Sequence, residues 1–247
     1  MGHVVVDHRG APVERTTWRT LAVFAHTFSG SSRVVARAAA GRLTPEDVDR
    51  TVRRWCAHVF RLSRATLVVH GDEALDRGRP YVLLANHQSL LDIPAAATAF
   101  PGRLRFVAKQ ELRSVPMFGR AMEAAGIVFV DRTNRERAIT QLEAARAHLA
   151  AGTSVFVAVE GTRSKDGSLG SFKKGGFHLA RALGTPILPT WIDGTLQVIP
   201  PGQLASVTGQ TVTVRFGAPI ATAEPIDTLM ARTREALLDL RSAGQAR

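Results

Sequence analysis

The sequence contains one cysteine, Cys56, in 247 residues. A single cysteine cannot form a disulfide within the chain and cannot supply the thiolates of a multi-cysteine metal site. The eight histidines are scattered along the chain, without an H-E-x-x-H motif or another paired-histidine spacing. We therefore expect no metal and no cofactor, and we expect Cys56 to be a small buried apolar residue.

Acidic residues and lysine are also scarce. Lys and Arg together number 32 against 21 Asp and Glu, which gives a formal net charge of +11, and only four of the 32 are lysine. So large a basic excess favours an anionic partner: nucleic acid, an anionic membrane surface or a phosphorylated substrate, which arginine grips with paired hydrogen bonds. Aromatic residues are only 6% and no zinc-finger, homeodomain or RNA-recognition motif is present, so we expect no nucleic acid among the partners.

The chain also lacks a hydrophobic run long enough to cross a membrane. The longest candidate stretch, Thr20–Ser32, has 13 uncharged residues, whereas a membrane span needs about 20 apolar residues. Around this stretch, apolar residues at helical spacing accompany arginines: Trp18, Leu21, Ala25 and Phe28, with Arg15, Arg19, Arg33 and Arg37. The S-G-S-S segment at residues 29–32 predicts a break between two short amphipathic helices. These helices would lie in a membrane interface or pack on the core.

Short apolar runs alternate with helical patterns along the rest of the chain. Strands are predicted at residues 66–69, 81–85, 105–108, 127–130, 154–159, 187–191 and 211–216, and helices at 44–62, 93–99, 116–125, 134–150, 174–183 and 226–241. Strands separated by helices predict an α/β fold with a mostly parallel central sheet flanked by helices. We expect two parts, an N-terminal helical, membrane-associating segment at 1–65 and a second domain at 66–247.

Ionisable residues follow several of the predicted strands within one to four positions. His87 follows the strand at 81–85, Lys109 the strand at 105–108, Arg132 the strand at 127–130, and Arg163 the strand at 154–159. The carboxyl ends of parallel strands meet at one edge of a sheet, where ligands bind in open α/β folds. The pattern therefore indicates a pocket for a phosphate or carboxylate beside a titratable histidine.

His87 and Asp92 are five residues apart, and on a straight helix such residues do not share a face. Asp92 reaches His87 only if His87 lies in the turn before a helix. Pro94 supports this arrangement, because proline is tolerated in the first turn of a helix and not in its interior. Asp92 would then orient the imidazole and leave its other nitrogen free as a base. The competing interpretation is that Asp92 caps the helix, with Ser89 forming part of a capping box.

The segment N-H-Q-S-L-L-D at residues 86–92 resembles the N-H-x-x-x-x-D signature of the glycerolipid acyltransferases, the 1-acyl-glycerol-3-phosphate acyltransferase family. Further blocks agree in order and spacing: K-Q-E-L-R-S-V-P-M-F-G at 109–119, G-I-V-F-V-D-R at 126–132, V-E-G-T-R-S at 159–164, S-F-K-K-G-G-F at 171–177 and T-P-I-L-P-T at 185–190. Ala158-Val159 stand where Phe-Pro is common in the family, and Thr190 where an apolar residue is common. These departures bear on acyl-chain and head-group preference. The resemblance covers about half of the chain.

The resemblance implies that residues 66–247 form an acyltransferase domain. It would transfer a fatty acyl group from acyl-CoA or acyl carrier protein to the free sn-2 hydroxyl of 1-acyl-glycerol-3-phosphate (lysophosphatidic acid), giving phosphatidic acid. His87 would act as general base with Asp92, and Lys109, Arg132 and Arg163 would bind the phosphate. Glu160 would orient Arg163, bind an acceptor hydroxyl or form a structural ion pair. Gly161 would allow close backbone approach or form a turn, and with Thr162 it would complete the substrate-binding residues.

Other interpretations remain open. The acceptor could be another lysolipid, such as a lyso-ornithine lipid, or glycerol 3-phosphate. A hydrolase or metal-dependent phosphatase using His87 and Asp92 is the competing enzyme class, although the sequence has no G-x-S-x-G elbow and lacks the extra carboxylates of a two-metal site. We interpret Ser89 as a turn or cap residue rather than a nucleophile. The expected location is the cytoplasmic face of the cell membrane, with the protein bound peripherally to an anionic surface.

Overall fold

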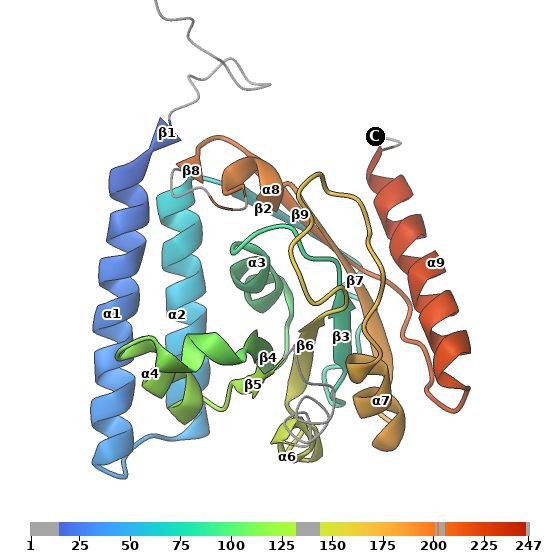
Figure 1. Cartoon of the computed structure of the whole chain (residues 1–247), viewed down its shortest axis with the longest axis horizontal. Helices are drawn as coiled ribbons and strands as arrows, with labels where there is room; N and C mark the ends of the chain where they lie inside the picture. The colour runs from blue at the N-terminus through green and yellow to red at the C-terminus, as the bar shows by residue number, and fades with distance from the viewer. Residues whose placement is uncertain (1–14, 132–143, 201, 203–205, 246–247) are drawn as a thin grey trace, which may run out of the picture.

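A seven-stranded sheet forms the centre of the computed structural model, which describes residues 15–131, 144–200, 202 and 206–245 (Figure 1). The strand order is β2-β9-β7-β3-β6-β4-β5. The strands are β2 (Thr66–His70), β3 (Val82–Ala85), β4 (Leu104–Lys109), β5 (Val128–Val130), β6 (Ser154–Ala158), β7 (Ile187–Asp193) and β9 (Thr211–Phe216). β3 to β7 run parallel, while β9 is antiparallel to β7 and pairs in parallel with β2. The predicted mostly parallel sheet and all seven of its predicted strands are confirmed.

Helices cover both faces of the sheet (Figure 1). The described helices are α1 (Thr17–Ala39), α2 (Pro45–Ser63), α3 (Asp92–Ala99), the 3-10 helix η1 (Gln110–Ser114), α4 (Phe118–Ala124), α6 (Ala144–Ala150), α7 (Gly175–Ala182), α8 (Thr195–Val198) and α9 (Ile226–Gln245). Residues 134–143 of the helix predicted at 134–150 lie outside the described residues, and the remainder is α6. A small antiparallel pair, β1 (Arg15–Thr16) with β8 (Ser206–Val207), was not predicted.

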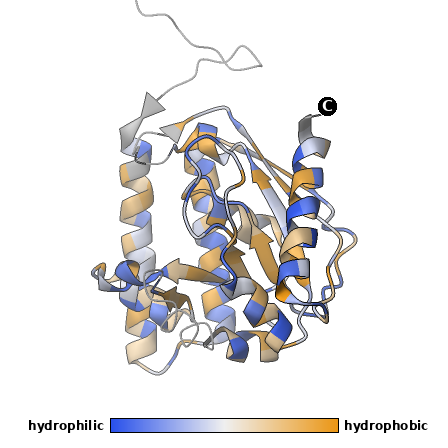
Figure 2. Ribbon diagram, turned by 45° about the vertical axis from the view of Figure 1, so that its right-hand side comes forward, coloured by the Kyte–Doolittle hydropathy of each residue, from blue (hydrophilic) through white to orange (hydrophobic). Residues whose placement is uncertain are grey.

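The central strand β3 shows why the sequence forms a doubly covered sheet. All four of its residues are fully buried, and they alternate between two hydrophobic clusters. Leu83 and Ala85 face the cluster that includes α2 and α3, whereas Val82 and Leu84 face the cluster that includes α6, α7 and α9. Figure 2 shows this hydrophobic centre between helices of mixed polarity. A strand buried on both faces needs a continuous apolar run, which is what the sequence contains.

Helix α2 begins as the sequence predicts. The Thr44 side chain accepts a hydrogen bond from the backbone N–H of Asp47, and the Asp47 carboxylate accepts one from the backbone N–H of Thr44. Pro45 occupies the first turn, where its missing N–H costs nothing. The helix buries Cys56 completely, and this burial raises the pKa of the thiol to about 12. The prediction that Cys56 is a buried apolar residue is therefore confirmed.

The prediction of two short N-terminal helices is wrong, because α1 is a single helix of 23 residues that runs through the S-G-S-S segment. A glycine inside a helix costs only about 1 kcal/mol relative to alanine. Packing of α1 against α2 and α4 outweighs this cost. Ser31 is buried, and the Trp55 indole on α2 donates a hydrogen bond to Thr27 on α1. The Ser32 hydroxyl is satisfied within the helix by the carbonyl of Phe28.

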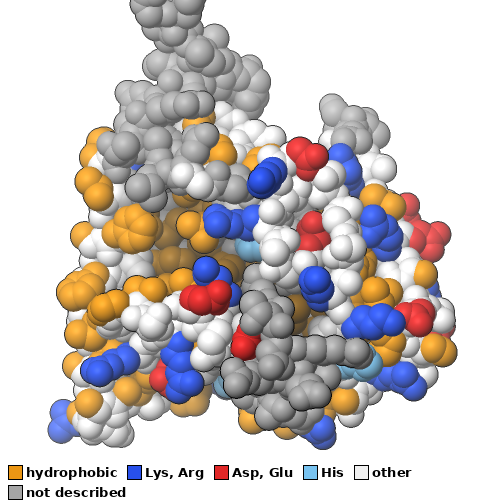
Figure 3. All heavy atoms as spheres, viewed as in Figure 1, with side chains coloured by type: hydrophobic (Ala, Val, Ile, Leu, Met, Phe, Trp, Pro, Cys, Tyr) orange, Lys and Arg blue, Asp and Glu red, His pale blue; other side chains and the backbone are white. Residues whose placement is uncertain are grey.

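The outer face of α1 carries exposed hydrophobic side chains. Trp18, Leu21, Phe24 and Phe28 are all more than half exposed, and Figure 3 shows hydrophobic side chains along the edge of the molecule where α1 lies. The apolar stripe predicted on this segment is therefore present on the surface. None of the helices in the described part of the chain combines the length and the hydropathy that crossing a membrane requires.

Candidate functional site

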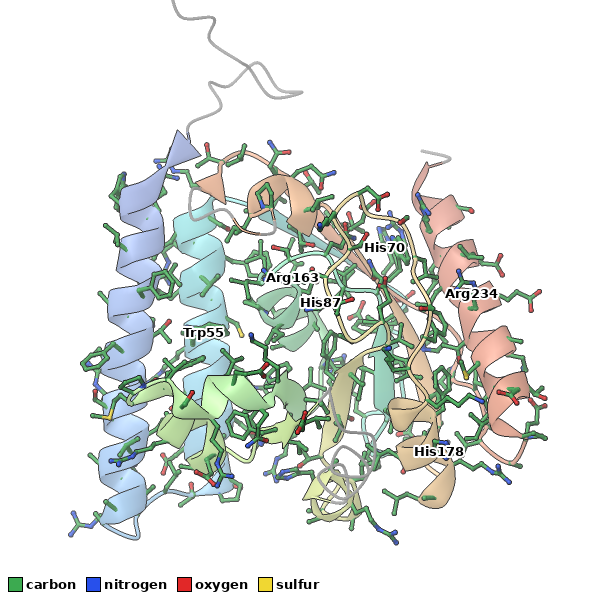
Figure 4. The ribbon with its side chains drawn as sticks, viewed as in Figure 1. Trp55, His70, His87, Arg163, His178 and Arg234 are labelled. Carbon is green, nitrogen blue, oxygen red and sulfur yellow. The ribbon has the colours of Figure 1, made fainter. Side chains whose placement is uncertain are left out.

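The predicted site residues lie where three neighbouring parallel strands end. His87 follows β3, Lys109 is the last residue of β4, and Glu160 to Arg163 follow β6. Because β6 lies between β3 and β4 in the sheet, the residues that follow these strands gather at one edge. The backbone N–H of Ser164 donates to the carbonyl of His87 over 2.7 Å, which joins the loop after β6 to the loop after β3. Figure 4 shows His87 and Arg163 in this region.

His87 and Asp92 form the pair that the sequence predicts. Helix α3 begins at Asp92, His87 lies in the turn before it, and the His87 Nδ1 to Asp92 Oδ2 distance is 2.7 Å. The Asp92 side chain is fully buried, whereas that of His87 is 13% exposed. A buried carboxylate at Nδ1 favours the tautomer with the proton on Nδ1, which leaves the lone pair on Nε2.

The hydrogen bonds of Asp92 extend beyond the histidine. Its Oδ2 atom also accepts the backbone N–H groups of Gln88 and Ser89, and its Oδ1 atom accepts the hydroxyl of Thr195. The residue before the helix, Leu91, makes no side-chain cap. The carboxylate therefore organises the turn that presents His87. The bond from the Ser89 N–H to Asp92 is also half of a capping box, whereas the Ser89 hydroxyl accepts from the N–H of Leu91 and not from that of Asp92, so Asp92 both orients His87 and caps the turn.

The remaining polar residues of the turn are anchored to backbone atoms. The Asn86 amide accepts from the N–H and donates to the carbonyl of Ile192 on β7, and the Gln88 amide donates to the same carbonyl. The Ser89 hydroxyl donates to the carbonyl of Ile199 and accepts from the N–H of Leu91. These contacts give Ser89 the bonding of a turn residue, as interpreted from the sequence.

Glu160 has a contact pattern that the sequence did not predict. Its side chain is buried, its Oε1 atom accepts the backbone N–H of His87 at 3.1 Å, and its Oε2 atom accepts the backbone N–H of Gly170 at 2.8 Å. The carboxylate thus links the histidine turn to the loop at 161–174. Only the spatial neighbourhood of β3 and β6 creates this link, so no local sequence signal could have indicated it.

The other predicted substrate-binding residues are a glycine in a turn, three exposed residues and one residue that the structure does not describe. Gly161 has a φ of +74° and closes a turn with Ala158, which favours glycine. Thr162, Arg163 and Lys109 are exposed at the same edge of the sheet as His87. Arg132 lies outside the described residues.

Arg234 on helix α9 binds the loop at 161–174. The Arg234 guanidinium donates to the carbonyls of Gly170 and Leu169 at 2.9 and 3.1 Å and lies over the Phe172 ring. Within the loop, hydrogen bonds from Ser168 and Ser164 lower the pKa of Asp166 to about 2. The loop that carries Arg163 is therefore an ordered turn attached to a distant helix. The sequence did not single out Arg234, which lies outside every motif block.

The surface beside the site is hollowed. Figure 3 shows a hollow with a hydrophobic floor between the side of the molecule formed by α1 and α4 and the loops near His87, with a histidine and cationic side chains at its rim. A separate cavity of about 320 Å³ lies at the opposite, amino end of the strands, where Arg53, Arg79 and Arg103 line it. Among the described residues, no group of three or more His, Cys, Asp and Glu side chains could hold a metal ion.

Comparison with known proteins agrees with this arrangement. Residues 66–193 match the Acyltransferase family model. The chain is 36% identical over 141 residues to human (Homo sapiens) 1-acyl-sn-glycerol-3-phosphate acyltransferase alpha, covering 57% of this chain and 50% of that protein. It is 37% identical over 148 residues to the Saccharomyces cerevisiae 1-acyl-sn-glycerol-3-phosphate acyltransferase, covering 58% of this chain and 48% of that protein. The chain therefore spans about half the length of these curated relatives.

A solved structure resembles nearly the whole chain. It is the crystal structure of the 1-acyl-sn-glycerophosphate (LPA) acyltransferase PlsC from Thermotoga maritima, which is 27% identical, has a TM-score of 0.79, and covers 94% of this chain and 95% of that one. The family match extends over more than half of the sequence and includes the strand ends that carry His87, Lys109 and Arg163. The chain belongs to the Acyltransferase family.

Proposed function

We propose that the protein transfers a fatty acyl group from a thioester, acyl-CoA or acyl carrier protein, to the free sn-2 hydroxyl of 1-acyl-glycerol-3-phosphate, giving phosphatidic acid. One observation carries the chemistry of this proposal: the 2.7 Å contact between His87 Nδ1 and a fully buried Asp92 carboxylate, beside a partly exposed imidazole. The names of the curated relatives support this choice of acceptor.

His87 and Asp92 would act as the base in a direct transfer. Nε2 of His87 removes the proton from the acceptor hydroxyl as its oxygen attacks the thioester carbonyl carbon. The buried Asp92 carboxylate stabilises the imidazolium that forms. The tetrahedral intermediate then collapses, the carbon–sulfur bond breaks, and the leaving thiolate takes the proton from the imidazolium. No covalent acyl-enzyme is needed, which agrees with the backbone-bonded hydroxyl of Ser89 and the buried thiol of Cys56.

The acceptor phosphate would be bound by the cations at the same sheet edge. Lys109 and Arg163 are exposed there, and we include Arg132 on its sequence position alone. Each guanidinium–phosphate hydrogen bond is charge-assisted and contributes about 1.5–3 kcal/mol. Gly161 and Thr162 would approach the acceptor through their backbone, and Glu160 would support the turn on which this binding depends.

The lipid nature of the acceptor and product supports a peripheral site of action on a membrane, and we propose that this is the anionic cytoplasmic face of the cell membrane. The exposed hydrophobic side chains of α1 would enter the interface, and the exposed Arg33 and Arg37 would face lipid head groups. The role predicted for Arg19 is wrong, because its side chain is buried.

In this view residues 1–65 serve mainly in membrane attachment and residues 66–247 in catalysis. The two segments are not separate in the fold, because α2 contributes Val59 and Phe60 to the core. The division is therefore a proposal about function.

An acceptor panel tests the proposal. Purified protein is mixed with acyl-CoA or acyl carrier protein thioester and with lysophosphatidic acid, lyso-ornithine lipid, glycerol 3-phosphate or no acceptor, and both free thiol and lipid products are measured. We expect phosphatidic acid from lysophosphatidic acid and little thiol without an acceptor. Equal thiol release in the absence of any acceptor would identify a thioesterase instead, and a product from another acceptor alone would replace the substrate that we propose.

A variant pair tests the phosphate contact in the same assay. Arg163→Ala should raise the KM for lysophosphatidic acid about tenfold with little change in the donor KM, because it removes a charge-assisted hydrogen bond. Arg181→Ala, which removes an exposed arginine from the last turn of α7, should change neither. Equal effects of Arg163→Ala on both KM values would show that Arg163 does not bind the acceptor phosphate.

A further inference from the structure

We propose that Thr195 is a positioning residue for the reaction, acting through Asp92. Its hydroxyl donates to Asp92 Oδ1 over 2.5 Å, and both side chains are fully buried. Thr195 lies just beyond the region that matches the family model. The proposal rests on the general-base role of His87 described above, and it extends the His87–Asp92 pair to a chain of three side chains.

The two carboxylate oxygens of Asp92 accept different numbers of hydrogen bonds. Oδ2 accepts three hydrogen bonds, from His87 Nδ1 and the backbone N–H groups of Gln88 and Ser89. Oδ1 accepts the hydroxyl of Thr195, which is its one hydrogen-bond donor among the described residues. Without this hydroxyl, a buried charged oxygen would lose its donor, and leaving such an atom unsatisfied is costly. The carboxylate would then rotate, and the rotation weakens its hydrogen bond to the imidazole.

The backbone before Thr195 is specialised to place this hydroxyl. β7 ends at Asp193, and α8 begins at Thr195 after Gly194, which has a φ of +83°. A Cβ atom at Gly194 would lie 2.0 Å from the carbonyl oxygen of Thr211 on β9, so only glycine fits there. This tight turn brings Thr195 to a residue 103 positions earlier in the chain. As a β-branched residue, threonine also has a restricted χ1, which keeps its hydroxyl aimed at Oδ1.

The contact is separate from the other anchors of the turn. Asn86 and Gln88 bind the backbone of Ile192, and Ser89 binds the carbonyl of Ile199. These bonds do not involve the Thr195 hydroxyl. Removal of the Thr195 hydroxyl should therefore leave the path of the turn intact and change mainly the orientation of the Asp92 carboxylate. We expect this change to affect catalysis more than folding.

Isosteric variants provide the kinetic test. Thr195→Val should lower kcat about tenfold, the loss expected for a hydrogen bond to a charged group, with both KM values within about twofold of wild type. Thr195→Ser should recover most of the activity. The matched control is Thr233→Val on α9, because Thr233 is also fully buried and its hydroxyl has no hydrogen-bond partner within the described part of the chain. It should leave kcat unchanged. If Thr195→Val folds poorly, the kcat of Thr195→Ser is compared with that of Thr195→Ala instead. The serine and alanine side chains differ only in the hydroxyl.

Two further measurements decide whether the effect runs through Asp92. In an Asp92→Ala background, Thr195→Val should alter the residual rate less than twofold. In the resting protein, the NMR signal of the His87 Nδ1 proton, assigned by its loss in His87→Ala, should move in Thr195→Val and stay in place in Thr233→Val. This signal needs no substrate, so it is independent of the proposed reaction. Wild-type kcat in Thr195→Val, an equal loss in the Asp92→Ala background, or an unmoved proton signal would overturn the proposal.

Discussion

At the scale of single residues, two buried carboxylates organise the loop that presents His87. Asp92 binds the imidazole from one side, and Glu160 binds the backbone N–H of the same residue from another. A carboxylate is expensive to bury unless its oxygens accept hydrogen bonds. Here the donors are largely backbone N–H groups of the site itself, so burial of each charge also restricts the loops around it.

Glu160→Gln should therefore destabilise the protein. One side-chain oxygen is replaced by an NH₂ group, which would face the N–H of His87 or of Gly170, so two donors would oppose each other. We expect a loss of about 1–3 kcal/mol in the free energy of unfolding, measured by urea denaturation, together with a lower kcat. The control is Glu235→Gln on the exposed side of α9, which should change stability little. Equal stability of the two variants would show that the Glu160 contacts contribute nothing.

The sequence predicted the residues of this site better than their connections. His87 and Asp92 were predictable because Pro94 and the helix start determine their local geometry. Glu160 contacts a residue 73 positions away and Thr195 contacts one 103 positions away. Those contacts depend on β3 lying between β6 and β7, and a pattern of apolar runs does not specify strand order.

At the scale of elements, apolar runs predicted strands reliably, whereas the glycine and serines in the N-terminal helix were misleading. Apart from β2, which has no buried residue, the sheet strands are wholly or partly buried runs bounded by turns, so their local signal and their tertiary environment agree. In α1 the local signal at residues 29–32 opposes the packing against α2 and α4, and the packing prevails. A break predicted from about 1 kcal/mol of local preference is easily reversed by side-chain burial.

Gly30→Ala tests the continuity of α1. Gly30 lies within the helix, and a Cβ atom there would meet no atom within 4 Å. Alanine should raise the free energy of unfolding by up to about 1 kcal/mol, seen as a higher Tm. Gly119→Ala is the opposing control, because its Cβ would lie 2.1 Å from the carbonyl oxygen of Arg113, and it should lower the Tm. A lower Tm in Gly30→Ala would indicate a broken helix.

Arg234 connects a second pair of elements, the loop at 161–174 and α9. Arg234→Ala should loosen the loop that carries Arg163 and raise the KM for lysophosphatidic acid by about threefold, because exposed hydrogen bonds of this kind contribute about 0.5–1.5 kcal/mol. The donor KM should stay the same. Arg232→Ala, also on α9, removes an exposed ion pair with Glu224 in the segment before the helix and should have no kinetic effect. An unchanged acceptor KM in Arg234→Ala would mean that the loop holds its shape without α9.

At the scale of the whole molecule, positive charge and exposed apolar surface occur together. The net charge is +11, and α1 exposes Trp18, Leu21, Phe24 and Phe28 along one edge. An enzyme that takes an acceptor from a bilayer and returns a product to it benefits from lying on that surface, since neither lipid then has to enter water. Aromatic insertion and attraction to anionic head groups would act together in this attachment.

Liposome binding tests this arrangement. We expect the full chain to co-sediment with anionic vesicles at low salt and to dissociate as salt rises, because screening weakens the electrostatic attraction. Phe24→Ser combined with Phe28→Ser should reduce binding markedly. Leu238→Ser removes an exposed hydrophobic side chain from α9, on the other side of the molecule (Figure 1), and should not. Failure of the full chain to bind at low salt would exclude attachment through α1.

The most direct test of the central claim is the kcat of His87→Ala with acyl-CoA and lysophosphatidic acid. General-base catalysis typically contributes about 10²–10⁴-fold, so kcat should fall by that factor while the protein remains folded. Asp92→Asn should cause a smaller but strong loss, because the imidazole loses its orienting charge. His178→Ala, which removes an exposed histidine from α7, should leave kcat unchanged. A His87→Ala variant within threefold of wild type would contradict the account.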